Sequence, residues 1–268
     1  MHNIKKQLLV IILAVTCIGN ASAQSHYSLS WEREGILGGI GLATAITGDA
    51  LASNLKAPTL SDISAFPLQR NNVNRFDRGA IGNWSESLST SSDVLVLALA
   101  ATPAVLMLSE DMKKDYLTIG FMYGETLWFS VFTSSIAKGG VKRVRPYAYN
   151  PSVPIDKKTI ADTRASFFSG HTVVAFASMS FFATVYNEYY PDSKYLPWIV
   201  GGGLVASSVA GVLRIESGNH FPTDVLAGAV VGTAFGYIIP ALHKGDSNVR
   251  VTPALIDSNP GVTLSLVF

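Results

Sequence analysis

The stretch WIVGGGLVASSVAGVLRIESGNHFPTDVLAGAVVGTAFGYIIPAL, residues 198–242, contains two long apolar runs separated by a short polar segment. Each run approaches the length of about 20 residues that a helix needs to cross a membrane. Both runs are rich in glycine, alanine and serine, and such small residues let helix backbones approach closely. The stretch therefore predicts two closely packed helices, joined by a turn that carries Arg214, His220 and Asp224.

Further apolar stretches precede this pair and extend the pattern along the chain. The six stretches of helical length are 36–55, 93–108, 117–137, 172–186, 196–213 and 225–242. Of the 268 residues, 48% are hydrophobic and only 15% are charged, whereas an average globular domain has about 25% charged residues. We expect an all-α fold, a membrane-embedded bundle of about six helices. A soluble all-helical domain with buried helices is the alternative.

The first 23 residues are typical of an export signal. Lys5 and Lys6 precede the apolar run LLVIILAVTCIG, and the small residues Ala21–Ala23 offer a cleavage site before Gln24. Cleavage would remove Cys17, the only cysteine of the chain, so the mature protein would have no thiol chemistry. An uncleaved anchor helix is the alternative.

Composition divides the chain into four parts. The signal, 1–23, precedes an N-terminal helix and polar loop, 24–91, then a core that carries three polar clusters, 92–245, and a tail, 246–268. In the tail, VRVTPALI and GVTLSLVF alternate in part and are separated by turn residues, which predicts a β-hairpin. Two strands cannot close a barrel, so we expect a small accessory hairpin.

The three polar clusters lie at the ends of predicted helices. Lys138 ends the third apolar stretch and Arg145 follows it, Ser169, Gly170 and His171 open the fourth, and the opening segment joins the last two. Cations beside apolar surface require an anionic partner, because burying an unpaired charge is costly, and the adjoining loops hold few acids. A phosphate group would fit, because arginine matches its geometry and helix N-termini attract anions.

The histidines of these clusters suit phosphoester cleavage. Asp224 follows His220 by four residues, within reach of the ring if the turn is helical. A carboxylate bonded to one ring nitrogen fixes the tautomer and leaves the other nitrogen as a nucleophile. His171, beside the same anion, would supply a general acid.

Each of these residues taken singly has a plainer interpretation. A histidine or arginine at a helix end is often a cap or a side chain that reaches to solvent, and Asp224 alone would be a first-turn acid. No histidine pair has zinc-like spacing, so we expect no metal, and we expect His26 and His243 to be incidental. The remaining cations of the second polar loop should form a solvated face; they are Lys142, Arg143, Lys157 and Lys158.

Together, the clusters resemble the tripartite signature of the type 2 phosphatidic acid phosphatase superfamily, which includes bacterial class A acid phosphatases and vanadium haloperoxidases. The resemblance covers about Ser92–Leu242, and two residues depart from it. Phe168 replaces the usual proline before the second motif, and Leu213 replaces the usual serine before the third-motif arginine. The matching residues are Lys138, Arg145–Pro146, Ser169–Gly170–His171, Arg214, His220 and Asp224.

This resemblance implies a metal-independent hydrolase of phosphoric esters or anhydrides that needs no cofactor. His220 would attack phosphorus and form a phosphohistidine, Asp224 would orient His220, and His171 would protonate the leaving oxygen and then activate water. The phosphate oxygens would be bound by Lys138, Arg145, Ser169, Gly170 and Arg214.

The resemblance also implies the class of substrate. The candidates are phosphorylated lipids in a bacterial cell envelope, namely phosphatidic acid, phosphatidylglycerophosphate, undecaprenyl diphosphate or lipid A. A soluble periplasmic acid phosphatase for small phosphoesters, and a non-catalytic lipid-phosphate binder or transporter, are the alternatives. The formal charge of +1 and the absence of a long basic run give no indication of nucleic-acid binding.

The number of membrane crossings decides which face carries the clusters. If the signal is cleaved and all stretches cross, three crossings separate Gln24 from the loop 138–170, which would then be cytoplasmic. Members of the family with six spans place the site on the outer face. We therefore expect an inner-membrane, multi-pass protein with a periplasmic site, whose first stretch, 36–55, lies along the interface or packs without crossing.

Overall fold

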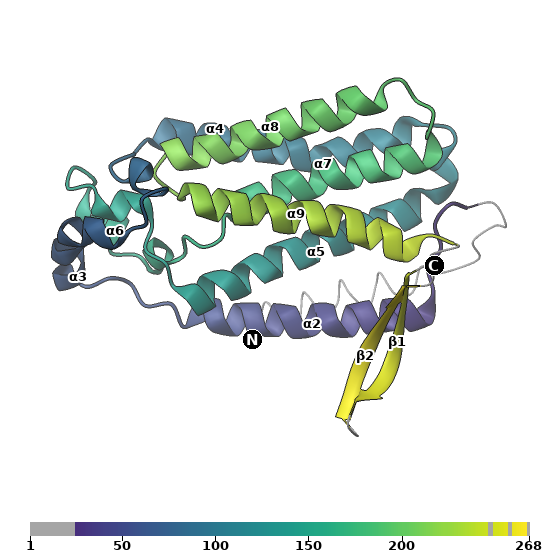
Figure 1. The fold of residues 1–268 in the computed structure, drawn as a ribbon, viewed down its shortest axis with the longest axis horizontal. Helices are drawn as coiled ribbons and strands as arrows, with labels where there is room; N and C mark the ends of the chain where they lie inside the picture. The colour runs from purple at the N-terminus through teal and green to yellow at the C-terminus, as the bar shows by residue number, and fades with distance from the viewer. Residues whose placement is uncertain (1–24, 246–248, 257–258, 267–268) are drawn as a thin grey trace.

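The computed structural model describes residues 25–245, 249–256 and 259–266. The predicted export signal and Cys17 lie outside the described residues. The described chain forms a bundle of long helices with a two-stranded sheet near its C-terminus (Figure 1). The expected all-α bundle of about six helices is therefore confirmed.

The long helices correspond to the six predicted stretches, and shorter helical segments lie between them. The long helices are α2 (Trp31–Ser53), α4 (Glu86–Ala101), α5 (Tyr116–Val141), α7 (Gly170–Tyr189), α8 (Leu196–Glu216) and α9 (Pro222–His243). The short helices are α3 (Leu60–Ala65) and α6 (Ile155–Lys158). Segments of 3-10 helix cover Phe66–Asn72, Arg78–Ala80, Thr102–Leu108, Met112–Asp115, Pro146–Tyr149 and Ala161–Arg164.

Local sequence explains where several helices begin. Ser30, Ser85 and Ser169 directly precede α2, α4 and α7, and each side-chain oxygen accepts a hydrogen bond from the backbone N–H three residues on. This bond satisfies one of the free donors at a helix N-terminus. Pro197 and Pro222 lie in the first turns of α8 and α9, where no intrahelical N–H bond is lost.

Helix α7 lies at the centre of the bundle. It contacts α4, α5, α8 and α9, whereas α2 packs lengthwise against α5 on the outside (Figure 1). Helices α2, α5 and α8 run in one direction along the bundle and α4, α7 and α9 in the other. The last turns of α5 and α8 therefore meet the first turns of α7 and α9 at one end of the bundle.

Glycines allow α9 to lie very close to α7. Gly228, Gly232 and Gly236 recur at every fourth residue of α9 and face α7. A Cβ atom added at Gly232 would lie 2.3 Å from the carbonyl oxygen of Val173. The predicted use of small residues for close helix packing is thus confirmed for this pair.

Four segments of the described chain are long and apolar enough to cross a membrane. They are Trp31–Ser53, Glu86–Leu108, Leu196–Glu216 and Pro222–His243. On α8 the outward-facing side chains are themselves apolar, as the exposed Val200, Leu204 and Val209 illustrate. A helix of a soluble domain would carry polar residues there, so these faces favour the membrane-embedded bundle over the soluble alternative.

The position of α2 bears on the expected topology. Its residues Trp31–Ser53 form one of the four candidate spans, and the helix lies alongside α5 over most of its length (Figure 1). This arrangement does not support the expectation that the first stretch lies along the membrane interface. The described chain then makes three passes along the bundle between residue 25 and the loop that follows α5.

The predicted hairpin in the tail is confirmed. Strand β1 (Val249–Ile256) pairs antiparallel with β2 (Asn259–Leu266), with Val249 opposite Leu266. The hairpin follows α9 and contacts α2 and α9 near the end of the bundle opposite to α3 and α6 (Figure 1).

We expect Gly232→Ala to destabilise the bundle by about 2 kcal/mol, because the new methyl group would overlap the backbone of α7 at Val173. Thermal unfolding of the detergent-purified protein measures the effect. Gly201→Ala is the matched control: no atom lies within 4 Å of the added Cβ atom, and alanine is favoured over glycine inside a helix. A Gly232→Ala protein as stable as the Gly201→Ala protein would contradict the proposed packing constraint.

Candidate active site

The structure brings the three predicted clusters together at one end of the bundle. Lys138 lies in the last turn of α5, and a Cβ atom on Gly170 at the start of α7 would lie 3.3 Å from its Nζ atom. The backbone N–H of Ser169 donates to the carbonyl oxygen of Asp224 at 3.0 Å. Arg145 Nη1 lies 3.4 Å from His220 Nε2. Residues up to 86 positions apart in the sequence, Lys138 and Asp224, therefore belong to one site.

His220 is held in the turn between α8 and α9 and is 1% exposed. Its Nδ1 atom lies 2.7 Å from the carbonyl oxygen of Ser166. A carbonyl oxygen can only accept, so the proton is on Nδ1, and the lone pair of Nε2 accepts a long hydrogen bond from Arg145 Nη1 at 3.4 Å. Asp224 Oδ2 lies farther from Nδ1, at 3.8 Å. The direct hydrogen-bond partner of the ring is thus Ser166, which the sequence analysis did not single out, rather than Asp224.

Asp224 is connected to His220 through Ser166. Its Oδ2 atom accepts hydrogen bonds from Ser166 Oγ at 2.5 Å and from the backbone N–H of Phe221 at 2.9 Å. Ser166 is therefore bound to Asp224 by its side chain and to His220 by its carbonyl group. If Asp224 orients His220 as the sequence predicts, it does so through Ser166 in this geometry.

The environment keeps the ring of His220 neutral. Burial, followed by the positive charges of Arg145, Lys138 and Arg214, lowers the pKa of His220 well below its ordinary value. A neutral imidazole with a proton on Nδ1 can use Nε2 as a nucleophile. The site therefore combines an available lone pair with a set of cations.

Arg145 is almost fully buried and has several partners. Its Nε and Nη2 atoms donate to the backbone carbonyl and to Oδ1 of Asp162, at 2.9 and 2.8 Å. Its Nη1 atom donates to the carbonyl oxygen of Asn219 at 3.1 Å. The guanidinium is thus aligned beside His220 by groups from two different loops.

Arg214 retains an unused donor. Its Nη1 atom bonds Ser89, Ser92 and Asp93, the last at 3.0 Å from Oδ1. Its Nε atom is buried and has no hydrogen-bond partner among the described residues. A buried unpaired donor is costly, so this N–H is suited to an oxygen atom of a bound anion.

The sequence predicts too few acidic residues to neutralise Lys138, Arg145 and Arg214. The structure confirms this for one of the three cations. Asp162 pairs with Arg145 and Asp93 pairs with Arg214. Both carboxylates are about half exposed, and Lys138 has no carboxylate partner within the described part of the chain. One positive charge is therefore left over among the three cations.

Ser169 directly precedes α7, and His171 lies in the first turn of this helix. The Oγ atom of Ser169 accepts from Thr172 Oγ1 at 2.8 Å and from the Thr172 N–H at 3.4 Å, so it serves as a helix cap. His171 is partly exposed, and its Nε2 atom lies 3.0 Å from Asp93 Oδ1. Asp93 therefore links His171 to Arg214. In the sequence, the only indication of a role for Asp93 is its position as an acidic residue at the start of the apolar stretch 93–108.

Two of the cations expected on a solvated face are not there. Arg143 bridges Asp224 at 2.5 Å and Asp77 at 2.6 Å, and its guanidinium lies 4.1 Å from the centre of the Phe221 ring. Lys158 is buried and donates to the carbonyl oxygen of Asn150. The expectation was wrong for these two, because neighbouring loops supply buried acceptors that the local sequence cannot reveal. Lys142 and Lys157 are exposed, as expected.

The polar loop after α2 also contributes to the site. Asp77 is fully buried and accepts from the backbone N–H and Oγ1 of Thr223 at 3.0 and 2.6 Å, as well as from Arg143. The loop thereby binds the first turn of α9, directly beside Asp224. Sequence reasoning had found no role for this loop.

Residues 119–247 match the PAP2 superfamily. The chain therefore contains a PAP2 superfamily domain. The predicted resemblance is confirmed, and the matched range includes every site residue named from the sequence, from Lys138 to Asp224.

Two known proteins resemble parts of this chain. Lipid A 1-phosphatase of Porphyromonas gingivalis is 38% identical over 71 residues, which are 26% of this chain and 15% of that protein. The chain thus matches only a small part of this relative. The crystal structure of the first transmembrane PAP2 type phosphatidylglycerolphosphate phosphatase from Bacillus subtilis has 20% sequence identity and a TM-score of 0.44. That match covers 74% of this chain and 93% of the other.

We expect Asp77→Asn to destabilise the protein by about 2 kcal/mol. The amide would present a donor to Thr223 and Arg143, which are donors themselves, and it would leave the partly buried Arg143 with one carboxylate partner fewer. Thermal unfolding measures the change. Asp156→Asn, at an exposed position near the same end of the bundle, is the control and should have no effect. Equal stability of the two variants would exclude this role for Asp77.

Proposed function

We propose that this PAP2 protein is a phosphatase that hydrolyses a phosphomonoester or diphosphate of a lipid through a phosphohistidine intermediate. The observation that carries the proposal is the unprotonated Nε2 atom of the neutral, buried His220, which lies 3.4 Å from Arg145 Nη1. A phosphate bound by this arginine would have its phosphorus atom next to the nucleophile. Within this proposal the catalytic step requires no metal ion.

The first step would be attack of His220 on phosphorus. A bond would form between Nε2 and phosphorus while the bond from phosphorus to the leaving oxygen breaks. Positive charge would then develop on the ring, and the Nδ1–H bond to the Ser166 carbonyl would stabilise it. Asp224, whose Oδ2 atom lies 3.8 Å from Nδ1, would add electrostatic support.

The cations would bind the negative charge of the transferred group. Lys138, Arg145 and Arg214 would contact the phosphate oxygens, and the unpaired Nε–H of Arg214 would gain its missing acceptor. Ser169 and the backbone N–H of Gly170 would complete the phosphate site at the N-terminus of α7.

His171 would serve the two proton transfers. Burial and the neighbouring cations lower the pKa of His171 to about 4 in the free site, and the negative charge of a bound phosphate would raise it so that the ring takes up a proton. His171 would then donate this proton to the leaving oxygen and later take one from the water molecule that hydrolyses the phosphohistidine. Its partial exposure gives water access to the ring, and Asp93 holds the ring next to Arg214. Asp93 would therefore be a positioning residue in this mechanism.

A lipid substrate is supported by the apolar outer faces of the bundle, because a site at the end of membrane-spanning helices lies at the level of lipid head groups. The name of the Porphyromonas gingivalis relative also refers to a lipid phosphate. We propose phosphatidic acid, phosphatidylglycerophosphate, undecaprenyl diphosphate and lipid A as the substrates to compare.

We expect His220→Gln to reduce phosphate release by at least about a thousandfold, because the nucleophile is lost. Phosphate release by detergent-purified protein would be measured with the four lipids and with a soluble aryl phosphate. With a radiolabelled substrate, the wild type should also yield an acid-labile phosphoprotein that the variant does not form.

His26→Gln is the control, because His26 is exposed on the N-terminal segment and stacks on Tyr189 away from the clusters. It should leave the rate unchanged. Equal phosphate release by the His220→Gln and wild-type proteins would refute the mechanism. A preference for the aryl phosphate over all four lipids would refute the lipid substrate alone.

We propose that the protein spans the inner membrane of a bacterial cell envelope, with the site on the periplasmic face. Three helices, α2, α4 and α5, separate residue 25 from the site, so the two lie on opposite faces if each helix crosses. A periplasmic site therefore requires residue 25 to be cytoplasmic, whereas cleavage of an export signal before Gln24 would leave residue 25 in the periplasm.

Single cysteines distinguish the two orientations in a Cys17→Ser background. Asp156→Cys lies in α6 at the site end of the bundle, and Lys194→Cys lies between α7 and α8 at the other end; both positions are exposed. In cells with a permeabilised outer membrane, an impermeant maleimide should label Asp156→Cys and not Lys194→Cys. The reverse pattern would place the site in the cytoplasm, and labelling of both would exclude a spanning bundle.

A further inference from the structure

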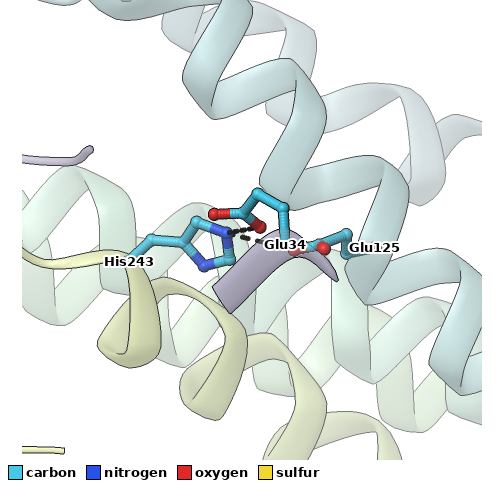
Figure 2. A group of neighbouring side chains, drawn as sticks. All are labelled: Glu34, Glu125 and His243. Atoms are coloured by element: carbon cyan, nitrogen blue, oxygen red, sulfur yellow. Dashed lines mark hydrogen bonds and ion pairs between the residues drawn. The ribbon is translucent and has the colours of Figure 1, made fainter. Parts of the chain in front are cut away.

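A second group of ionisable side chains is buried at the end of the bundle opposite to the candidate active site. Figure 2 shows Glu34 of α2, Glu125 of α5 and His243, the last residue of α9, which point toward one another. His243 is 0% exposed, and the side chains of Glu34 and Glu125 are 4% and 13% exposed. The expectation that His243 is incidental was therefore wrong.

The hydrogen bonds of His243 determine which ring nitrogen faces the carboxylates. Nδ1 lies 2.8 Å from the carbonyl oxygen of Ile239, which can only accept, so Nδ1 carries a proton. Nε2 lies 3.1 Å from Glu34 Oε2 and 3.2 Å from Glu125 Oε2. With a neutral ring and two ionised carboxylates, three lone pairs would face one another in a buried space. A proton or a metal ion must therefore lie among these atoms.

A proton on Nε2 would satisfy only one of the two carboxylates. The N–H bond has one direction, and the geometry of a hydrogen bond is met with Glu34. The Oε2 atom of Glu125 is buried and has no hydrogen-bond partner among the described residues. Leaving a buried carboxylate oxygen unpaired is costly. A metal ion, by contrast, can bond all three atoms at once.

The separations of the three atoms agree with a small tetrahedral ion. Bonds of about 2.0–2.1 Å from zinc to histidine nitrogen and carboxylate oxygen place neighbouring ligands about 3.3 Å apart. The observed separations from Nε2 are 3.1 and 3.2 Å, and all three ligand atoms lie within 4.8 Å of one another.

The surrounding groups orient two of these ligands. The Ile239 carbonyl fixes the tautomer of His243, as the outer partner of a metal-bound histidine commonly does. The other oxygen of Glu34, Oε1, accepts from the Ser30 N–H at 3.1 Å and from Arg33 Nε at 3.0 Å. These bonds leave Oε2 of Glu34 directed at the centre of the group.

We propose that Glu34, Glu125 and His243 bind a divalent transition-metal ion of the zinc class, with one coordination position left for water. The ion would join α2, α5 and α9, whose ligands Glu34 and His243 are 209 residues apart in the sequence. Because it lies at the opposite end from His220, its role is to fasten α2 to the bundle. The inference is independent of the proposed phosphatase activity.

The test uses Zn²⁺ alone as the probe. Full-length protein, purified in detergent without an affinity tag, is stripped with a chelator, desalted and titrated with Zn²⁺. We expect one tightly bound ion per chain by elemental analysis and a rise in the unfolding temperature of about 5 °C or more. Glu125→Gln keeps the shape of the side chain but weakens the ligand, and it should reduce Zn²⁺ affinity at least about tenfold.

Glu188→Gln is the matched control, because Glu188 pairs with Lys244 at the same end and lies outside the group. It should bind Zn²⁺ as the wild type does. Equal binding by the wild-type and Glu125→Gln proteins would refute the site. If Glu125→Gln does not fold, the wild type alone decides, since no bound ion and no shift in its unfolding temperature would also refute it. Neither readout depends on catalytic activity.

Discussion

The close contact between α7 and α9 is the constraint on which the site depends. Gly228 and Gly232 bring the backbones of these helices so near that an added Cβ atom would lie 2.7 Å or less from the facing carbonyl oxygens of α7. At the same end, the N–H of Ser169 donates to the carbonyl oxygen of Asp224. This contact sets the first turn of α7 against the first turn of α9, and with them the second and third motifs. Looser packing would separate the anion-binding helix end from His220.

Two buried histidines, His220 and His243, lie at opposite ends of the bundle, and the charges around each ring determine what its free nitrogen can bind. His220 and His243 each place Nδ1 against a backbone carbonyl oxygen, so each presents Nε2 to its neighbours. Around His220 these neighbours include cations, which lower its pKa and favour an incoming anion. Around His243 they are the carboxylates of Glu34 and Glu125, which favour a proton or a metal ion instead. The same tautomer therefore suits a nucleophile at one end and a metal ligand at the other.

The loops are as important to the site as the helices that carry the motifs. Arg143 and Asp77 come from different loops and meet at Thr223, in the first turn of α9. Through Arg143 this group also holds Asp224, which binds Ser166, whose carbonyl group in turn holds His220. A chain of buried polar contacts thus connects the polar loop after α2 to the ring. Most of these polar side chains have hydrogen-bond or ion-pair partners. The group can therefore be rigid without burying an unpaired charge.

The order of residues was sufficient to predict the helical bundle, the hairpin and the residues of the three motifs. The lengths of the apolar stretches, their content of small residues and the charges at their ends are local properties of the chain. They can therefore be read from the sequence without knowing how the helices pack. Tertiary structure alone decided that Ser166 rather than Asp224 contacts the ring of His220, that Arg143 is partly buried between Asp77 and Asp224, and that His243 meets two glutamates. These contacts join residues between 54 and 209 positions apart. No periodicity or spacing in the sequence encodes such pairs, because they exist only once the helices have packed.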